Sequence, residues 1–208
     1  DEDNNLHLQD AEDIAAVALA TNPGILKQKV YLDAFPQQSD AGGSRYPAVN
    51  QQLAERMQKG VLIWNYSGHG GFRRLAEEVV LDRDIVDGWE QGGKLPLFIT
   101  ATCDFAPFDN PAINSLGEYL LLKPVGGAIA LMTTTRLVFA FSNRIMNRNY
   151  LQAALEPQPG GHFRSLGQAV MAAKNKTYQT SGDIFNNRKF LLLGDPAMTL
   201  AFPHPIPP

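Results

Sequence analysis

Short apolar runs without polar alternation are the feature that most restricts how this chain can fold. Residues 61–66 (VLIWNY) and 96–102 (PLFITAT) are rich in bulky apolar side chains, and residues 128–133 (AIALMT) form a third such run. Strands that are covered on both faces have this pattern, which is typical of parallel sheets. The sequence therefore predicts a sheet with helices on both of its faces.

Helical segments are predicted between these runs. Two capping boxes, in which Ser115 precedes Glu118 and Ser165 precedes Gln168, each mark the start of a helix. The alternation of strands and helices favours the α/β class with a mostly parallel sheet. The two capped helices are expected to end at Leu122 and near Lys176. The other expected elements are a helix over 10–20 with Asp10 as its N-cap, a strand over 28–35, a polar loop over 36–45, a helix that begins at Pro47, a short helix or turn over 81–89, a helix over 140–155 and a last strand over 190–193.

Composition limits the classes of function. The chain has 208 residues, of which 44% are hydrophobic, so it can bury a sizeable core. Its net charge of −3 argues against a nucleic-acid partner, and its single cysteine excludes an intramolecular disulfide. Because the chain begins with Asp1 and ends in PHPIPP, we expect a catalytic domain over residues 1–202, cut from a larger protein, and a proline-rich boundary or linker over 203–208.

Two of the apolar runs end in residues that are suited to nucleophilic chemistry. His69 stands among glycines after the first run, and Cys103 ends the second. Functional groups gather beyond the carboxyl ends of parallel strands, so both residues are expected at the same edge of the sheet. A cysteine attacks as its thiolate, and a neighbouring imidazole takes up the thiol proton and later protonates the leaving group. The pair therefore predicts a cysteine nucleophile with a histidine base.

Residues beside this pair are candidates for binding the substrate. The backbone amides of Gly70 and Cys103 are expected to form an oxyanion hole. The neighbouring glycines are expected to give His69 access and unusual backbone angles. Asp104 and Phe105, which follow the cysteine, and Thr133, at the end of the third run, are expected to border the substrate pocket.

Simpler interpretations of these residues stay open. A lone cysteine in a strand is often an inert part of the core, and the glycines could form only a turn or an anion-binding loop. Asp104 and Phe105 could be no more than loop residues. The acidic start of the chain has the ligand spacing of a calcium loop but lacks the required glycine at its sixth position, where Leu6 stands. A solvated acidic turn is the better interpretation, and we expect no cofactor and no catalytic metal.

Five segments, taken in order, resemble the gingipain-type cysteine peptidases, which share the caspase-like fold. The resemblance extends from the first residues of the chain to Phe202. The segments are YSGHGG at 66–71, LPLFI at 95–99 running to Cys103, LGEYLL at 116–121, GGAIA at 126–130 and LGDPA at 193–197. This resemblance implies a caspase-like α/β sheet in which the histidine and the cysteine stand at the carboxyl ends of strands.

The same resemblance implies a set of catalytic roles. Cys103 would be the nucleophile, His69 its base and acid, and the amides of Gly70 and Cys103 the oxyanion hole. A third, acidic residue often orients the histidine in this family from a segment that precedes it, and its place would fall to Asp3 or Asp1.

Within the family the chain is most similar to the signal peptidases and sortases of the type IX secretion system of Bacteroidetes. The matching segments are DEDNNLH at 1–7, ATCDF at 101–105, Phe108-Asp109 and NNR at 186–188. This similarity implies an outer-membrane protein at the cell surface that works with other secretion-system components. It would remove the C-terminal signal domain of secreted cargo proteins through a Cys103 thioester and join the new carboxyl end to an amine of anionic lipopolysaccharide.

Two other functions remain as alternatives. The first is a gingipain-like cysteine protease that only hydrolyses its substrate. The second is a catalytically degenerate domain that binds cargo tails without cutting them. A labelled amine acceptor separates the first alternative from the sortase, and the reactivity of the Cys103 thiol tests the second.

Overall fold

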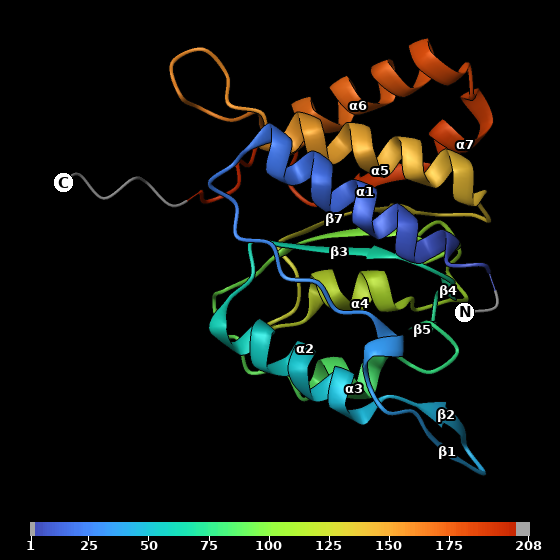
Figure 1. Ribbon diagram of the computed structural model, residues 1–208. Helices are drawn as coiled ribbons and strands as arrows, with labels where there is room; N and C mark the ends of the chain where they lie inside the picture. Colours follow the sequence, from blue (N-terminus) through green and yellow to red (C-terminus); the bar gives the residue numbers. More distant parts are fainter. Residues whose placement is uncertain (1–2, 203–208) are drawn as a thin grey trace.

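In the computed structural model, which describes residues 3–202, a four-stranded sheet lies between two groups of helices (Figure 1). The strand order is β3-β6-β7-β8; the first three strands run parallel, and β8 is antiparallel to β7. The elements are α1 (Leu6–Thr21), the 3₁₀ turn η1 (Leu32–Ala34), β1 (Gln38–Asp40), β2 (Gly43–Arg45), α2 (Pro47–Lys59), β3 (Ile63–Ser67), β4 (Gly70–Gly71), β5 (Arg74–Leu75), α3 (Arg83–Asp87), β6 (Leu97–Ala101), α4 (Leu116–Leu122), β7 (Ala130–Thr134), α5 (Ala140–Leu155), α6 (Leu166–Ser181), α7 (Ile184–Lys189) and β8 (Phe190–Leu193).

The predicted α/β architecture is confirmed, and the apolar runs form the centre of the sheet. Every residue of β6 and of β7 is buried, as expected for strands that are covered on both faces. β3 lies at one edge of the sheet, where Trp64 is buried and the next residue, Asn65, is exposed. β6 lies between β3 and β7, so it has a neighbouring strand on each side.

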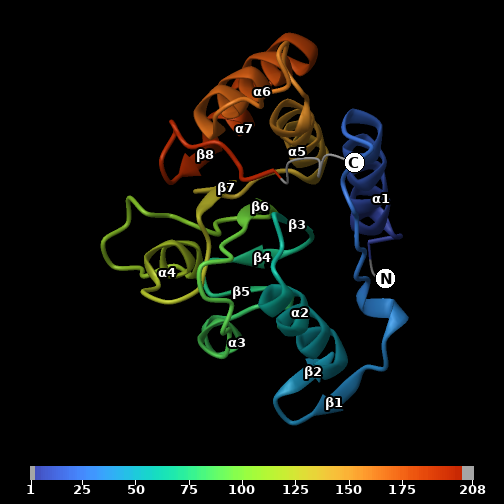
Figure 2. The same ribbon diagram turned by 90° about the vertical axis from the view of Figure 1, so that its left-hand side faces the viewer.

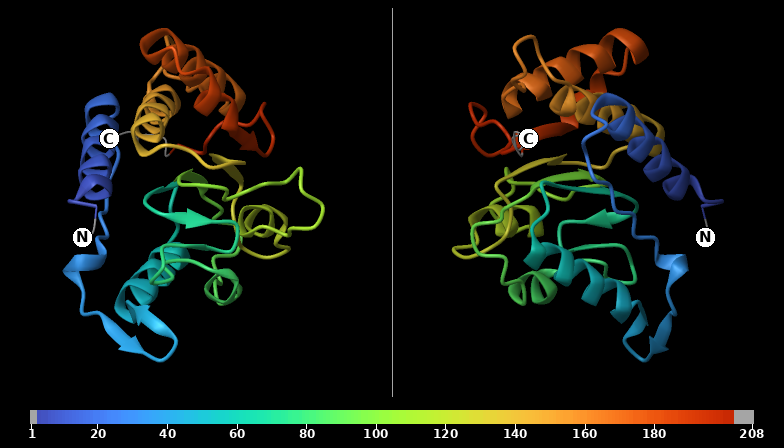
Figure 3. Two further views of the ribbon diagram at one scale, coloured as in Figure 1. Left: turned by 90° about the vertical axis from the view of Figure 1, so that its right-hand side faces the viewer. Right: turned by 60° about the vertical axis from the view of Figure 1, so that its left-hand side comes forward.

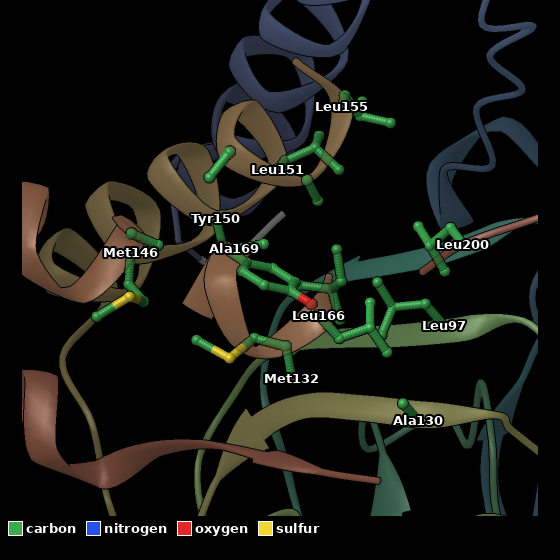
Figure 4. Packing of buried hydrophobic residues seen from close by; sticks show 14 of the residues in the cluster. Leu97, Ala130, Met132, Met146, Tyr150, Leu151, Leu155, Leu166, Ala169 and Leu200 are labelled. Carbon is green, nitrogen blue, oxygen red and sulfur yellow. The ribbon is translucent and has the colours of Figure 1, made fainter. Parts of the chain in front are cut away.

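One face of the sheet is covered by α1, α5 and α6, and the other by α2, α3 and α4 (Figures 1 and 2). Leu97 and Met132 point to the first face, where Figure 4 shows them below Tyr150 of α5. Phe98 points to the second face, where it stacks on Trp64 with a distance of 5.1 Å between ring centroids. Neighbouring strand residues enter opposite layers because side chains alternate along a strand.

The local signals for helix starts are largely confirmed. In both capping boxes the serine side chain accepts the backbone N–H of the third helical residue, and that residue's side chain accepts the serine N–H. Pro47 occupies the first turn of α2, and α5 spans 140–155 as predicted. The helix that begins after Ser165 continues to Ser181, five residues beyond the predicted end.

The N-terminal third of the chain corrects two expectations. Asp10 is not an N-cap: α1 begins at Leu6, so Asp10 lies in the second turn, buried and 3.6 Å from Arg144 of α5. Residues 28–35 form no strand. Lys29 and Tyr31 instead bind Glu12 on α1, which holds the segment against a helix, away from any strand partner.

Two further findings concern the ends and loops of the chain. The predicted loop over 36–45 contains the small hairpin β1–β2. The proline-rich segment 203–208, like Asp1, lies outside the described residues. Within residues 3–202, no helix combines the length and the apolar character needed to cross a membrane.

Candidate active site

The pairing of β3 with β6 brings His69 and Cys103 to the same edge of the sheet, namely the one formed by the carboxyl ends of its parallel strands. Ser67 lies opposite Ala101 in the parallel register, and each of the two functional residues follows two positions later. In Figure 1 this edge is the one towards which the β3 arrow points, beside β4 and the start of α1. The sequence prediction that both residues stand beyond neighbouring strand ends agrees with this placement.

The backbone of His69 is fixed by two hydrogen bonds to its carbonyl oxygen. The Tyr66 hydroxyl donates one at 2.7 Å, and the N–H of Ala76, which follows the β4–β5 hairpin, donates the other at 2.9 Å. A Cβ atom on Gly68 would lie 2.5 Å from the Tyr66 hydroxyl oxygen, so a larger residue cannot occupy this turn without displacing the tyrosine. The imidazole itself belongs to an exposed residue, which leaves it accessible to a substrate.

Gly70 brings the histidine loop close to the strand that carries the cysteine. A Cβ atom at Gly70 would lie 2.8 Å from Oγ1 of Thr102, the residue before Cys103. None of the glycines 68, 70 and 71 has a positive φ angle. The expectation of unusual backbone angles is therefore wrong. Close packing explains why glycine occupies positions 68 and 70.

Cys103 is half-buried and is held against the segment that follows β7. Its Sγ–H donates to the carbonyl oxygen of Val138 at 3.6 Å. The next residue, Asp104, has a left-handed φ of 43°, and its N–H donates to the carbonyl of Arg136 at 3.3 Å. The chain thus turns sharply after the cysteine and presents the thiol beside residues 136–138.

Both functional side chains lie on the α1 and α5 side of the sheet. The thiol contacts Val138, directly before α5, and the imidazole of His69 contacts His7 of α1. Among residues 3–202 no hydrogen bond joins Cys103 to His69, and the thiol donates to the Val138 carbonyl instead. Hydrogen bonds between catalytic groups are often loose in a free enzyme and tighten when a substrate binds.

The structure places Asp3 next to a histidine that the sequence prediction did not include. The Asp3 carboxylate accepts the backbone N–H groups of Leu6 and His7, and one of its oxygens lies 3.6 Å from Nε2 of His7. His7 packs edge-on against His69, with 4.9 Å between ring centroids and 86° between ring planes. The four-residue spacing of Asp3 and His7 was a sequence signal for the Asp3–His7 contact alone, and His7 lies in a helix that was expected to begin four residues later.

Burial lowers the pKa of His7, and the nearby His69 lowers it further, while the carboxylates of Asp3 and Asp10 oppose the change. His7 is therefore held closer to its neutral form than an exposed histidine would be. Burial also raises the pKa of Asp104, and the cations Arg136 and Lys189 oppose that shift.

The residues expected to border a substrate pocket lie in different environments. Asp104 is partly exposed next to the thiol, as a pocket residue would be. Phe105 and Thr133 are completely buried, the first in the α4 side of the core and the second hydrogen-bonded to Thr100, so neither reaches a substrate in this structure. Sequence reasoning missed a group of exposed apolar side chains that lies next to Val138 in the chain, namely Leu137, Phe139 and Phe141.

A metal site would need several His, Cys, Asp or Glu side chains close together. Within the described part of the chain, no three His, Cys, Asp or Glu side chains gather in a way that would hold a metal ion. Asp1, the alternative orienting acid and first residue of the acidic turn, is not among those residues.

Comparison with known proteins gives matches at the level of family and fold. The model of peptidase family C25 matches residues 1–201. The Arg-specific cysteine proteinase gingipain R superposes with a TM-score of 0.64 at 16% identity over 73% of this chain. The complex of pro- and mature domains of RgpB from Porphyromonas gingivalis gives 0.63 at 18% identity over 73%, and a structure described only as a protease gives 0.60 at 14% over 92%. No curated protein sequence matches this chain significantly.

The chain spans only part of these relatives: it covers 36%, 37% and 53% of the three solved chains, respectively. The superpositions show that the fold is the caspase-like α/β fold of the gingipains, seen here as a mostly parallel sheet with helices on both faces (Figure 3).

Proposed function

This chain belongs to peptidase family C25, and we propose on that basis that it is a cysteine endopeptidase with Cys103 as nucleophile and His69 as base. The observation that supports the proposal is the β3–β6 register, which brings the two residues to one strand edge on the same side of the sheet. The exposed imidazole and the half-buried thiol are accessible to an extended polypeptide.

The proposed reaction begins when Cys103 gives up its hydrogen bond to Val138 and transfers the thiol proton to His69. The thiolate attacks the scissile carbonyl carbon, and the carbonyl oxygen becomes an oxyanion that the amides of Gly70 and Cys103 stabilise. The protonated His69 then donates its proton to the leaving amine as the C–N bond breaks. The product is a thioester between the substrate's new carboxyl end and the sulfur of Cys103.

We extend the proposal to transpeptidation, in which an amine resolves the thioester. His69 takes the proton of the attacking amine, the amide forms, and the thiol of Cys103 is released. Transfer in place of hydrolysis requires that water be kept from the thioester. In this proposal the exposed apolar side chains of Leu137 and Phe139, the sequence neighbours of Val138, supply that shielding when a substrate is bound.

We propose the substrate and the acceptor that are implied by a resemblance, seen in the sequence at residues 1–7, 101–105, 108–109 and 186–188, to PorU, the sortase of the type IX secretion system. In this proposal the enzyme cleaves the C-terminal signal domain from secreted cargo at the outer membrane, on the cell surface. It joins the cargo to an amine of anionic lipopolysaccharide and works beside other components of the secretion system. No cofactor takes part in the proposed reaction.

The test uses cargo that carries its C-terminal signal domain, together with a fluorescent primary amine. Cleavage with an amine adduct at the new carboxyl end supports the transpeptidase, and a Cys103→Ala variant is expected to give neither product. Cleavage without any adduct would leave a hydrolase and reject the transfer step.

Because Cys103 is the single cysteine of the sequence, iodoacetamide labels only this thiol. A labelling rate no higher than that of a free thiol, with cargo left intact, would reject the peptidase function itself.

A further inference from the structure

His7 occupies a fixed position against the ring of His69. Its backbone N–H donates to Asp3 Oδ2 at 3.2 Å, and that of Leu6 donates to Oδ1 at 3.0 Å, so one carboxylate holds the first turn of α1. The His7 side chain is 18% exposed, and its ring meets that of His69 edge-on. Figure 3 shows the start of α1 beside the loops at this edge of the sheet.

This contact restricts how the catalytic imidazole can turn. The His69 backbone is held by Tyr66 and Ala76, but its side chain is exposed and has rotational freedom about its own bonds. A base must lie within hydrogen-bond reach of the proton that it removes. If a neighbouring group excludes unproductive orientations of the His69 ring, the productive orientation is more populated. The ring of His7 provides one wall of that space.

Several charged groups around His7 determine its protonation. Asp3, before α1, lies 3.6 Å from its Nε2; Asp10 lies on the next turn of α1, is buried and pairs with Arg144 of α5. On the remaining side stands His69 itself. A neutral His7 leaves His69 free to take up a proton, whereas a charged His7 opposes the second positive charge.

We propose that His7, supported by Asp3, is a positioning residue that orients His69 and makes its proton uptake depend on the charge of His7. The proposal rests on the role of His69 as the base of the proposed peptidase. It assigns to α1 a part in catalysis that the family match and the structural similarities do not specify.

The rate of Cys103 alkylation by iodoacetamide measures this role without a peptide substrate. His7→Ala is expected to slow alkylation at pH 7 by roughly tenfold, because His69 loses the wall that orients it. His7→Phe keeps a ring in place and is expected to react within about twofold of the wild type at pH 7. At the acid pH where His7 of the wild type becomes protonated, the same variant is expected to react faster than the wild type, since it has no charge to oppose proton uptake by His69.

Two matched variants serve as controls. His162→Ala removes an exposed histidine in the loop between α5 and α6 and is expected to keep the wild-type rate and pH dependence. Asp3→Asn keeps the size of the side chain but removes the charge that favours protonated His7. Because His7 is then less readily protonated, the alkylation rate of the Asp3→Asn variant is expected to fall less at acid pH than that of the wild type.

The outcomes separate this role from the peptidase function. A His7→Ala variant that reacts at the wild-type rate, or a His7→Phe variant that follows the wild type through the whole acid range in which His7 becomes protonated, would overturn the positioning role alone. A wild-type Cys103 that reacts as slowly as a free thiol, and no faster than in a His69→Ala variant, would overturn the peptidase proposal together with this one. If His7→Ala fails to fold in a thermal melt, the acid behaviour of His7→Phe decides the question.

Discussion

The close approach of Gly70 to Thr102 leads to a prediction about activity without loss of the fold. Gly70→Ala would place a Cβ atom 2.8 Å from Thr102 Oγ1 and 3.2 Å from the carbonyl oxygen of Arg74. The shortest ordinary contact of a Cβ atom is 3.4 Å, so the histidine loop must move away from the cysteine strand by about 0.6 Å. This movement displaces the Gly70 amide, one of the two proposed oxyanion donors.

The size of the expected effect follows from the role of that amide. Removal of one oxyanion-hole donor costs about 10²- to 10³-fold in kcat, and a displaced donor retains part of its interaction. We therefore expect Gly70→Ala to lower kcat by roughly 10- to 100-fold while KM changes little, because the oxyanion exists only after the substrate has bound. Steady-state cleavage of a signal-domain substrate measures both constants, and a thermal melt reports whether the fold is retained.

The neighbouring glycine and the neighbouring threonine supply the controls. A Cβ atom at Gly71 meets nothing within 4 Å, so Gly71→Ala is expected to retain wild-type kcat. Thr102 Oγ1 is buried and has no hydrogen-bond partner among the described residues, so Thr102→Ala removes the closest of the obstacles and leaves no polar group unpaired. The double variant Gly70→Ala/Thr102→Ala should recover much of the lost kcat. Equal activity of the Gly70→Ala and Gly71→Ala enzymes would refute this reasoning, as would a double variant no better than Gly70→Ala.

Two other predictions concern the loop and the helix beside the site. Tyr66→Phe removes the 2.7 Å hydrogen bond to the His69 carbonyl and is expected to lower the free energy of unfolding by about 1 kcal/mol, measured by urea denaturation, with slower alkylation of Cys103. Asp10→Asn is expected to raise Tm at pH 7, since burial raises the pKa of Asp10 above 3.8 despite Arg144, so the ionised form destabilises the folded state. That advantage should shrink as the pH falls through the raised pKa and vanish below 3.8; an unchanged or lower Tm at pH 7 would contradict it.

The strands at the centre of the sheet could be predicted because burial on both faces is the main requirement on their side chains. Residues of β6 and β7 are buried on both faces, so apolar side chains occupy every position that does not contact another polar group. The capping boxes at Ser115 and Ser165 were equally readable, because both partners of each box lie within four residues of sequence. Short-range signals of this kind do not depend on the rest of the fold.

The N-terminal segment was harder to predict because tertiary contacts decide its structure. Asp10 has the residue type of an N-cap, but its pairing with Arg144, more than a hundred residues away, places it inside α1. A strand was expected over residues 28–35, yet Lys29 and Tyr31 of this segment bind Glu12 on α1 and not another strand. For the same reason the contact between His7 and His69 could not be found from spacing.

The glycines around His69 show how one sequence motif combines different physical requirements. Gly68 makes room for the Tyr66 hydroxyl that binds the His69 carbonyl, and Gly70 makes room for Thr102 on the neighbouring strand. Gly71 meets neither restriction, and none of the three needs a left-handed backbone. A motif of glycines therefore indicates close approach at two sides of the histidine, towards its own strand and towards that of the cysteine. If catalysis depends on this packing, an alanine should be harmful at 68 and 70 and harmless at 71.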